Sequence, residues 1–169
     1  GFTYFDLPGG DRVGIIDVPG HERFINNMVA GVVGMDLVLL VIAADEGIMP
    51  QTREHMDILN LLGIEKSIIV LNKCDIVDEE WLELVEEEVK DELEGTFLEQ
   101  APVVKVSAAT GEGLEGLVDM IEKMTRDEVT EKDVQTIPRL PVDRAFTISG
   151  FGTIITGTLV SGMITKEDT

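Results

Sequence analysis

The sequence is poor in several features that would narrow its function. Cys74 is the one cysteine among 169 residues, so the sequence cannot form an internal disulfide, and we expect a reducing compartment. Lys and Arg number 13 against 33 Asp and Glu, a net charge of −20, which argues against direct binding of nucleic-acid phosphates by most of this segment. The longest strongly apolar run, Leu37 to Ala44, is too short to span a bilayer. With no basic leader or cleavage-like site, we expect no secretory signal and a cytoplasmic location.

Short apolar runs that alternate with amphipathic segments predict an α/β domain. Strand-like runs cover residues 2–7, 12–17, 35–44, 66–71 and 103–106, and helical spacing covers residues 22–31, 49–62, 78–94 and 114–124. The run 35–44 is nearly all Val, Leu and Ile, which is typical of a strand buried on both faces. Since strands and helices alternate, we expect a mainly parallel sheet with helices on both faces, preceded by a hairpin. The many acidic residues of 78–94 indicate a solvated helix face and no site.

Two changes in composition divide the chain. Residues 127–137 are polar and almost free of core residues, which indicates a linker. Residues 138–169 contain Thr-, Val- and Ile-rich runs separated by glycines, which predicts the first strands of a β-barrel domain. We therefore expect part of one domain over residues 1–126 and a truncated second domain. The sequence opens on Gly1 inside a strand-like run, so we expect it to be an excised piece.

Asp17 ends an apolar run, and Val18-Pro19-Gly20-His21 follows it. In open α/β sheets, ligands bind outside the carboxyl ends of the strands. A carboxylate there can hold Mg²⁺, usually through water. Pro19 sets the direction of the chain, and Gly20 lets the backbone approach a phosphate closely. Because an Asp-x-Pro-Gly turn with no ligand is the more common event, this motif alone is weak evidence.

Two more motifs follow predicted strands: Asn72-Lys73-Cys74-Asp75 and Ser107-Ala108-Ala109. The Asp75 carboxylate can accept hydrogen bonds from the N1–H and the amine of guanine, and adenine offers neither donor. Asn72 can brace the loop, and the stem of Lys73 can lie against the base while its ammonium stays in water. The Ala108 N–H can donate to guanine O6. An N-K-x-D motif after a strand strongly indicates guanine binding, whereas a Ser-Ala pair without that motif is no evidence for it.

With these motifs in place, the chain resembles the GTPase domain of the translation factors, the family of elongation factor Tu. The runs DVPGHERFINNM, ADEGIMPQTREH, NKCD and VSAATGEG are similar to the wider family. The run LPVDRAFTISGFGTIITGTLVSG resembles the branch of selenocysteine-specific elongation factors. The resemblance covers nearly the whole chain. It implies a P-loop GTPase-type α/β fold over residues 1–126, followed by the start of a translation-factor β-barrel.

The resemblance also implies GTP or GDP and Mg²⁺ as ligands. Asp17 is similar to the residue that holds Mg²⁺ through water, and Gly20 resembles the glycine whose N–H meets the γ-phosphate. His21 resembles the residue that positions the attacking water, and it is the candidate catalytic residue. An exposed histidine is more often inert, and we expect only a helix-face or packing role for His55. The candidate GTP-binding residues are Asp17, Val18, Pro19, Gly20, His21, Asn72, Lys73, Asp75, Ser107, Ala108 and Ala109.

The chain departs from the family because it contains no G-x-x-x-x-G-K-[ST] motif. We expect this phosphate loop N-terminal to Gly1, and we expect the segment alone to bind GTP poorly and to be inactive. A lone cysteine such as Cys74, without His or Cys neighbours, is not a metal site.

The resemblance implies a monomeric GTPase that delivers selenocysteyl-tRNA to the ribosome, with a selenoprotein mRNA element recognised by C-terminal domains that this sequence lacks. Asp143 and Arg144 are the candidates for the aminoacyl pocket, although their spacing alone fits a surface ion pair. Two other functions stay open. The chain could come from another elongation- or initiation-factor GTPase, or from a degenerate, non-hydrolysing GTPase-like scaffold.

Overall fold

The computed structural model describes residues 1–18, 35–64, 66–126 and 136–166, except for the side chains of Phe2 and Asp143. In chain order its strands and helices are β1 (Phe2–Asp6), β2 (Arg12–Ile16), β3 (Val38–Ala43), α2 (Pro50–Leu61), β4 (Ser67–Asn72), η2 (Cys74–Ile76), α3 (Glu79–Leu93), β5 (Val103–Lys105), α4 (Leu114–Arg126), β6 (Val142–Ile148) and β7 (Gly152–Gly157). The helix expected over residues 22–31 and most of the linker lie outside the described residues.

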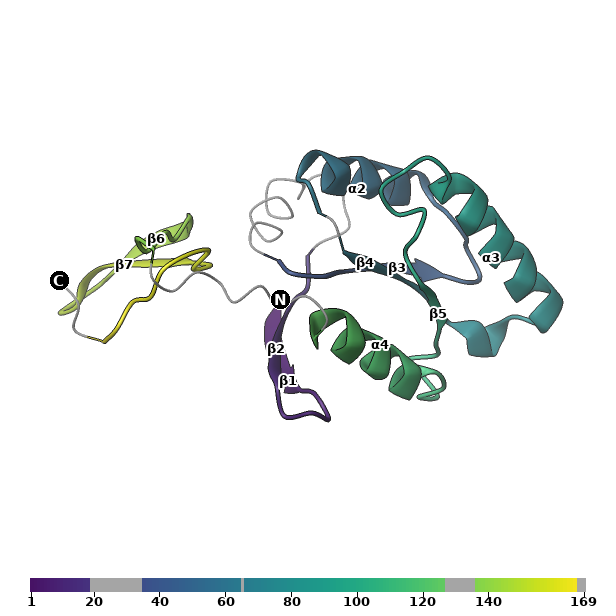
Figure 1. Cartoon of the computed structure of the whole chain (residues 1–169), viewed down its shortest axis with the longest axis horizontal. Helices are drawn as coiled ribbons and strands as arrows, with labels where there is room; N and C mark the ends of the chain where they lie inside the picture. Colours follow the sequence, from purple (N-terminus) through teal and green to yellow (C-terminus); the bar gives the residue numbers. More distant parts are fainter. Residues whose placement is uncertain (19–34, 65, 127–135, 167–169) are drawn as a thin grey trace.

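A parallel sheet with the strand order β3-β4-β5 lies between helices of the chain up to residue 126 (Figure 1). Ala43 pairs with Asn72, and Leu71 pairs with Lys105. Each of these pairs lies at or near the C-terminal ends of its two strands. Because all three strands are parallel, the loops that follow them leave from one edge of the sheet, which is where α/β proteins bind their ligands.

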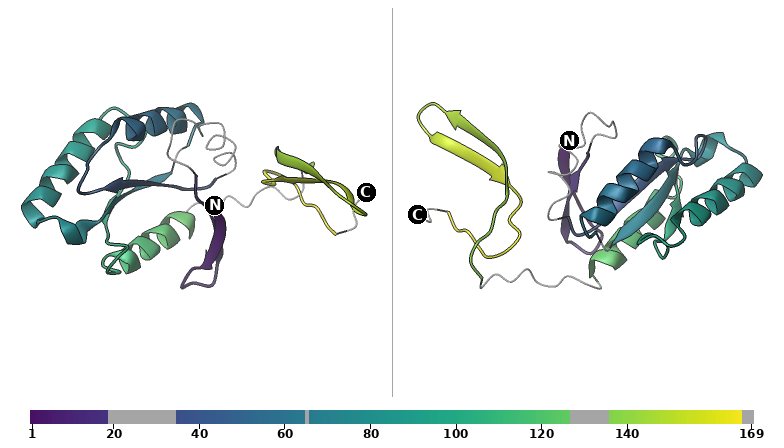
Figure 2. Two further views of the ribbon diagram at one scale, coloured as in Figure 1. Left: turned by 180° about the vertical axis from the view of Figure 1, so that it is seen from behind. Right: turned by 90° about the horizontal axis from the view of Figure 1, so that it is seen from above.

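Neighbouring residues of β4 point to opposite faces of the sheet, and each face has its own core. On one face Leu71 packs in a cluster with Met56 of α2 and Val89 of α3. On the other face Ile68 packs in a cluster with Ile121 of α4. Figure 2 shows α2 and α3 on one side of the sheet and α4 on the other. The prediction of helices on both faces is confirmed.

The prediction that the run 35–44 forms a strand buried on both faces is wrong. Leu40 and Ile42 are buried under α2 and α3, but Leu39 is 39% exposed and Val41 is 58% exposed. The physical reason is coverage, because the core cluster under α4 includes residues of β4 and β5 and none of β3. In the described part of the chain, β3 is therefore an edge strand with one open face.

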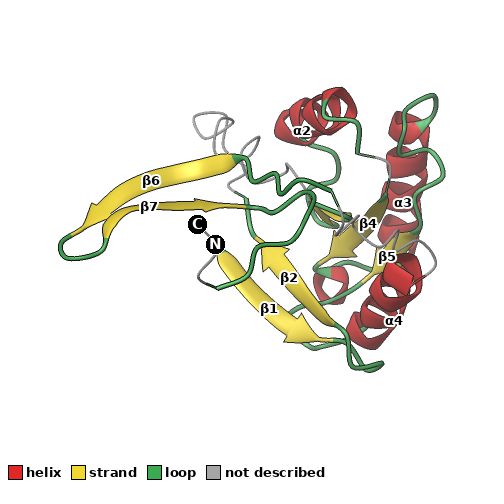
Figure 3. Ribbon diagram, turned by 60° about the vertical axis from the view of Figure 1, so that its left-hand side comes forward, coloured by secondary structure: helices red, strands yellow, loops and turns green. Residues whose placement is uncertain are grey.

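Two antiparallel hairpins complete the described structure (Figure 3). The predicted first hairpin pairs β1 with β2, and Leu7 at its turn is buried in the α4 cluster. In the second hairpin β6 pairs with β7, and the register shifts between Val142 and Arg144. An isolated bridge joins Arg139 to Ser161. That these strands begin a β-barrel stays a prediction.

Candidate functional site

The base loop, which we define as residues 72–75, leaves the C-terminal end of β4. Its second residue, Lys73, has a φ angle of +66°. A side chain in this left-handed region crowds its own backbone, so such a residue keeps this conformation only where its surroundings hold it. Asp75 follows in η2 with its side chain exposed, so its carboxylate is accessible to a ligand.

The base loop is tied to the loop that follows β5. Asn72 Oδ1 accepts a hydrogen bond of 3.0 Å from the Ala108 N–H. The Cys74 N–H donates to the Val106 carbonyl at 3.2 Å. The structure thus brings together the two motifs that the sequence separates and that we predicted to recognise guanine. The Ala108 N–H, which we predicted to donate to guanine O6, here donates to Asn72, so a base would have to share or replace this bond.

Ser107 shapes the loop after β5 from within. Its side chain is fully buried, and its Oγ accepts a hydrogen bond from the Thr110 N–H at 3.1 Å. Its own N–H donates to the Glu112 carbonyl at 2.9 Å, and its carbonyl accepts from the Gly111 N–H at 2.8 Å. Ser107 therefore holds the loop, while Ala109 beside it is exposed.

Asp17 directly follows β2, and its side chain is 86% exposed. Val18 is half-buried against the small cluster formed under α2. Pro19, Gly20 and His21 lie outside the described residues. Among the contacts of the described residues, none joins Asp17 to the base loop. The structure thus places the strand-end carboxylate where the sequence predicts it and does not test the rest of that motif.

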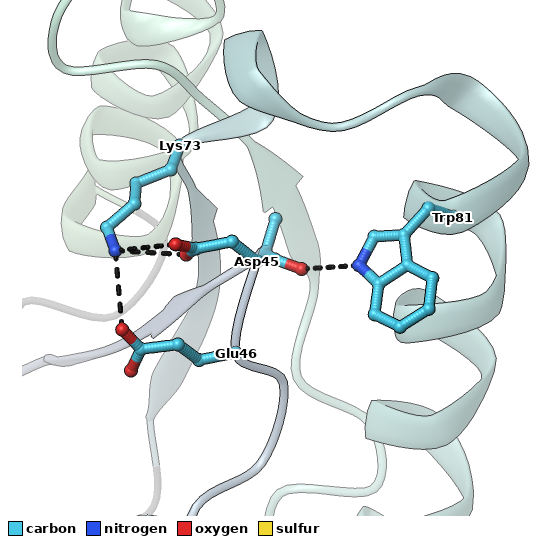
Figure 4. A network of polar contacts seen from close by, with 5 residues as sticks. Asp45, Glu46, Lys73 and Trp81 are labelled. Carbon is cyan, nitrogen blue, oxygen red and sulfur yellow. Dashed lines mark hydrogen bonds and ion pairs between the residues drawn. The ribbon is translucent and has the colours of Figure 1, made fainter.

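Lys73 makes an ion pair that sequence reasoning missed (Figure 4). Its Nζ lies 3.0 Å from both carboxylate oxygens of Asp45 and 3.5 Å from Glu46 Oε1. The hydrogen bond with Asp45 is the main reason that the pKa of Lys73 is raised. The ammonium therefore binds carboxylates, where we expected it to be solvated only. The contact follows from the pairing of Ala43 with Asn72, because the residues after paired parallel strands start side by side.

Trp81 of α3 supports the loop that carries Asp45 (Figure 4). Its indole Nε1–H donates to the Ala44 carbonyl at 2.9 Å. The helix is fixed at this end because Asp78 caps it, with its Oδ1 accepting a hydrogen bond from the Trp81 N–H at 2.8 Å. No sequence signal marked Trp81, which lies far along the chain from its partner.

The other candidates take simpler positions. Cys74 is half-buried, burial raises the pKa of its thiol, and its Sγ lies within hydrogen-bond distance of the Leu71 carbonyl. His55 is half-buried on α2. Arg144 is exposed and its backbone pairs with Thr156. Within the described ranges, no three His, Cys, Asp or Glu side chains gather as metal ligands could.

A family model described as the elongation factor Tu GTP-binding domain matches residues 6–127. The chain belongs to this family. The chain is 57% identical over 164 residues to the selenocysteine-specific elongation factor of Desulfomicrobium baculatum, and the match covers 97% of this chain and 26% of that protein. It is 40% identical over 169 residues to the factor of the same name from Escherichia coli (strain K12), with 99% and 27% covered.

Solved structures agree with these relatives. The crystal structure of a bacterial selenocysteine-specific elongation factor, EF-Sec, is 42% identical with a TM-score of 0.85, covering 96% of this chain and 28% of that one. Elongation factor SelB from Methanococcus maripaludis, in complex with the GTP analogue GppNHp, is 34% identical with a TM-score of 0.87, covering 96% and 36%.

The predicted α/β GTPase-type fold and the resemblance to the selenocysteine-specific branch are confirmed. The chain spans about a quarter to a third of the length of these relatives. Within the described part of the chain, every helix is too short or too polar to cross a membrane.

Proposed function

We propose that this chain supplies the guanine-recognition loops of a translation elongation GTPase that delivers selenocysteyl-tRNA to the ribosome. The observation that carries the proposal is the hydrogen bond between Asn72 and Ala108. It joins the N-K-x-D loop to the Ser-Ala loop at the edge of the sheet where α/β proteins bind ligands. The relatives named as selenocysteine-specific elongation factors support the choice of cargo.

In this proposal the base is recognised by groups at the ends of β4 and β5. The exposed Asp75 carboxylate accepts the N1–H and the amine of guanine, which adenine does not offer. The stem of Lys73 lies along the base. The Ala108 N–H is the candidate donor to guanine O6, and it would share or replace its hydrogen bond to Asn72. The nucleotide is therefore selected by its hydrogen-bonding edge rather than by its size.

The phosphate end of the site rests on the first motif. Bound Mg²⁺ would neutralise charge on the phosphates. The exposed Asp17 carboxylate at the end of β2 suits a water-mediated contact with such an ion, because no charged group has to be buried for the contact to form. The Gly20 N–H would contact the γ-phosphate, and His21 would orient the attacking water. This sequence contains no G-x-x-x-x-G-K-[ST] motif, so we assign phosphate contacts to Asp17, Gly20 and His21 alone.

The cargo site is assigned to Asp143 and Arg144 of β6. The register shift at this point supports the assignment, because a bulge re-aims the side chains around it. A selenol is more acidic than a thiol, so selenocysteine is an anion at neutral pH and serine is not. A fixed guanidinium favours that anion, and Asp143 can orient it. We further propose a monomeric, cytoplasmic protein whose other domains recognise the mRNA element.

The test uses the full-length protein with two variants. Asp75→Asn should weaken GTP binding by about 2–4 kcal/mol and favour xanthosine triphosphate, whose extra carbonyl suits an amide donor. Asp91→Asn, an exposed carboxylate on α3, controls for the lost charge and should leave GTP affinity unchanged. His21→Ala should leave GTP affinity within a factor of a few but lower ribosome-stimulated hydrolysis on the order of 10²-fold.

Unchanged GTP affinity in Asp75→Asn, measured by titration calorimetry, would refute guanine recognition by this loop. Full single-turnover hydrolysis on ribosomes by His21→Ala would refute the catalytic role. The two results are independent, because one reports the base and the other reports the γ-phosphate.

A further inference from the structure

The base loop and the loop after β3 start side by side. Ala43 and Asn72 are paired in the parallel ladder, and the Ala44 N–H extends this pairing by donating to the Asn72 carbonyl at 2.8 Å. Asp45 and Lys73 are therefore the first residues beyond the paired ladder in two neighbouring loops. Their backbones are fixed by the sheet before their side chains meet.

The loop that carries Asp45 is held from its own side as well. The Gly47 N–H donates to the Ala43 carbonyl at 2.9 Å, which closes a tight turn around Asp45. Gly47 makes this turn with a φ angle of +68°. The Trp81 indole N–H holds the Ala44 carbonyl from α3. The Asp45 carboxylate is thus presented by a rigid turn and needs little ordering to bind a cation.

In contrast to Asp45, Lys73 has a long side chain with many rotatable bonds, and its backbone is in the left-handed conformation. The Asp45 carboxylate contacts its ammonium with both oxygens, and the neighbouring Glu46 contacts it at the longer distance of 3.5 Å. The Asp45 side chain is 31% exposed, whereas that of Glu46 is 55% exposed. Asp45 is therefore less screened by water, and it is the stronger partner of the two.

We propose that Asp45 is a positioning residue for guanine nucleotide binding: it anchors the Lys73 ammonium and thereby aligns the Lys73 stem and the base loop before the nucleotide arrives. An aligned loop loses less conformational freedom on binding, which improves affinity without a direct contact. This inference rests on the proposed function of the base loop. It adds Asp45, a residue of the loop after β3 that does not contact the base. Trp81 of α3 supports this loop through its hydrogen bond to Ala44.

The test is a double-mutant cycle on GDP affinity in the full-length protein. Asp45→Asn keeps the shape of the side chain and removes its charge, and it should raise the Kd for GDP about fivefold, the upper range for a partly exposed ion pair. Lys73→Met keeps an apolar stem and should raise the Kd by at least as much. Because Asp45 acts through Lys73, the double variant should match Lys73→Met alone. Glu46→Gln is the matched control, with an expected change of less than about twofold.

Two further measurements separate positioning from a general loss of structure. Added salt should reduce the difference between wild type and Asp45→Asn, because an exposed ion pair is screened, whereas a damaged fold would not recover. Trp81 is the one tryptophan of this sequence. When the fluorescence of Trp81 is used to follow unfolding, the nucleotide-free Asp45→Asn variant should have the same unfolding midpoint as nucleotide-free wild type.

Additive effects in the double variant, or a Kd for Asp45→Asn equal to that of wild type, would overturn the positioning role. If Lys73→Met and Asp75→Asn still weaken GDP binding in that case, the base loop keeps its proposed function, and only the role of Asp45 is refuted. If Lys73→Met and Asp75→Asn both leave the affinity unchanged, the proposed function fails, and the role of Asp45 fails with it.

Discussion

Replacing Gly113 by alanine should destabilise the protein more than the same change at Gly111, two residues earlier in the same loop. Gly113 has a φ angle of +74°, and an added Cβ would lie 2.1 Å from the Lys105 carbonyl oxygen and 3.1 Å from the carbonyl carbon. That carbonyl belongs to the backbone of β5, which is paired with β4. It cannot rotate away as a side chain could, so the loop or the strand must move.

The expected magnitude follows from two costs. A left-handed backbone costs an L-residue about 1–2 kcal/mol. Forcing an extra methyl group into packed backbone costs about 1–3 kcal/mol more. Gly113→Ala should therefore lower the free energy of unfolding by about 2–5 kcal/mol. Gly111 has a φ angle of +86° with nothing within 4 Å of the added Cβ, so Gly111→Ala should incur only the first cost.

Urea denaturation of both variants, followed by far-UV circular dichroism, measures the two losses. The difference between them should be about 1–3 kcal/mol. Equal losses would refute the argument, because they would show that the loop moves away from the Lys105 carbonyl at no cost. Wild-type stability in both variants would further show that the left-handed conformations are not maintained in solution.

The remaining predictions concern acid stability and cargo. Hydrogen bonds from Lys105 at 2.7 Å and from Lys90 at 2.5 Å lower the pKa of Glu86, so its stabilising effect is present above the unfolded-state pKa and lost as the pH falls through the folded-state value. Glu86→Gln should therefore lower the free energy of unfolding at neutral pH by about 0.5–1 kcal/mol, a value reduced because Lys105 is partly exposed to solvent. The difference from wild type should vanish on acidification, and a difference that stays constant with pH would contradict this. Glu87→Gln, at an exposed position of the same helix, is the control. Arg144→Ala in the full-length factor should narrow the affinity gap between selenocysteyl- and seryl-tRNA in the GTP state, and an unchanged ratio in competition binding would return Arg144 to a surface role.

The sequence alone was enough to predict most of the described elements up to residue 126, because helices and strands are encoded by local periodicity. The strand expected over residues 12–17 is β2, and the helix expected over residues 78–94 is α3, with Asp78 as its N-cap. Pro50 opens α2, as its fixed φ angle favours. The two motifs proposed to recognise guanine were also evident, because each is short and each follows a strand.

Only the tertiary structure could decide which faces are covered and which loops meet. The apolar run of β3 predicted burial on both faces, yet Val41 is exposed because coverage depends on where α4 packs, which β3 does not encode. The ion pair between Lys73 and Asp45 joins residues 28 positions apart, and the bond from Trp81 to Ala44 joins residues 37 positions apart. Such contacts depend on the order of strands in the sheet, and periodicity within a segment carries no information about its neighbours.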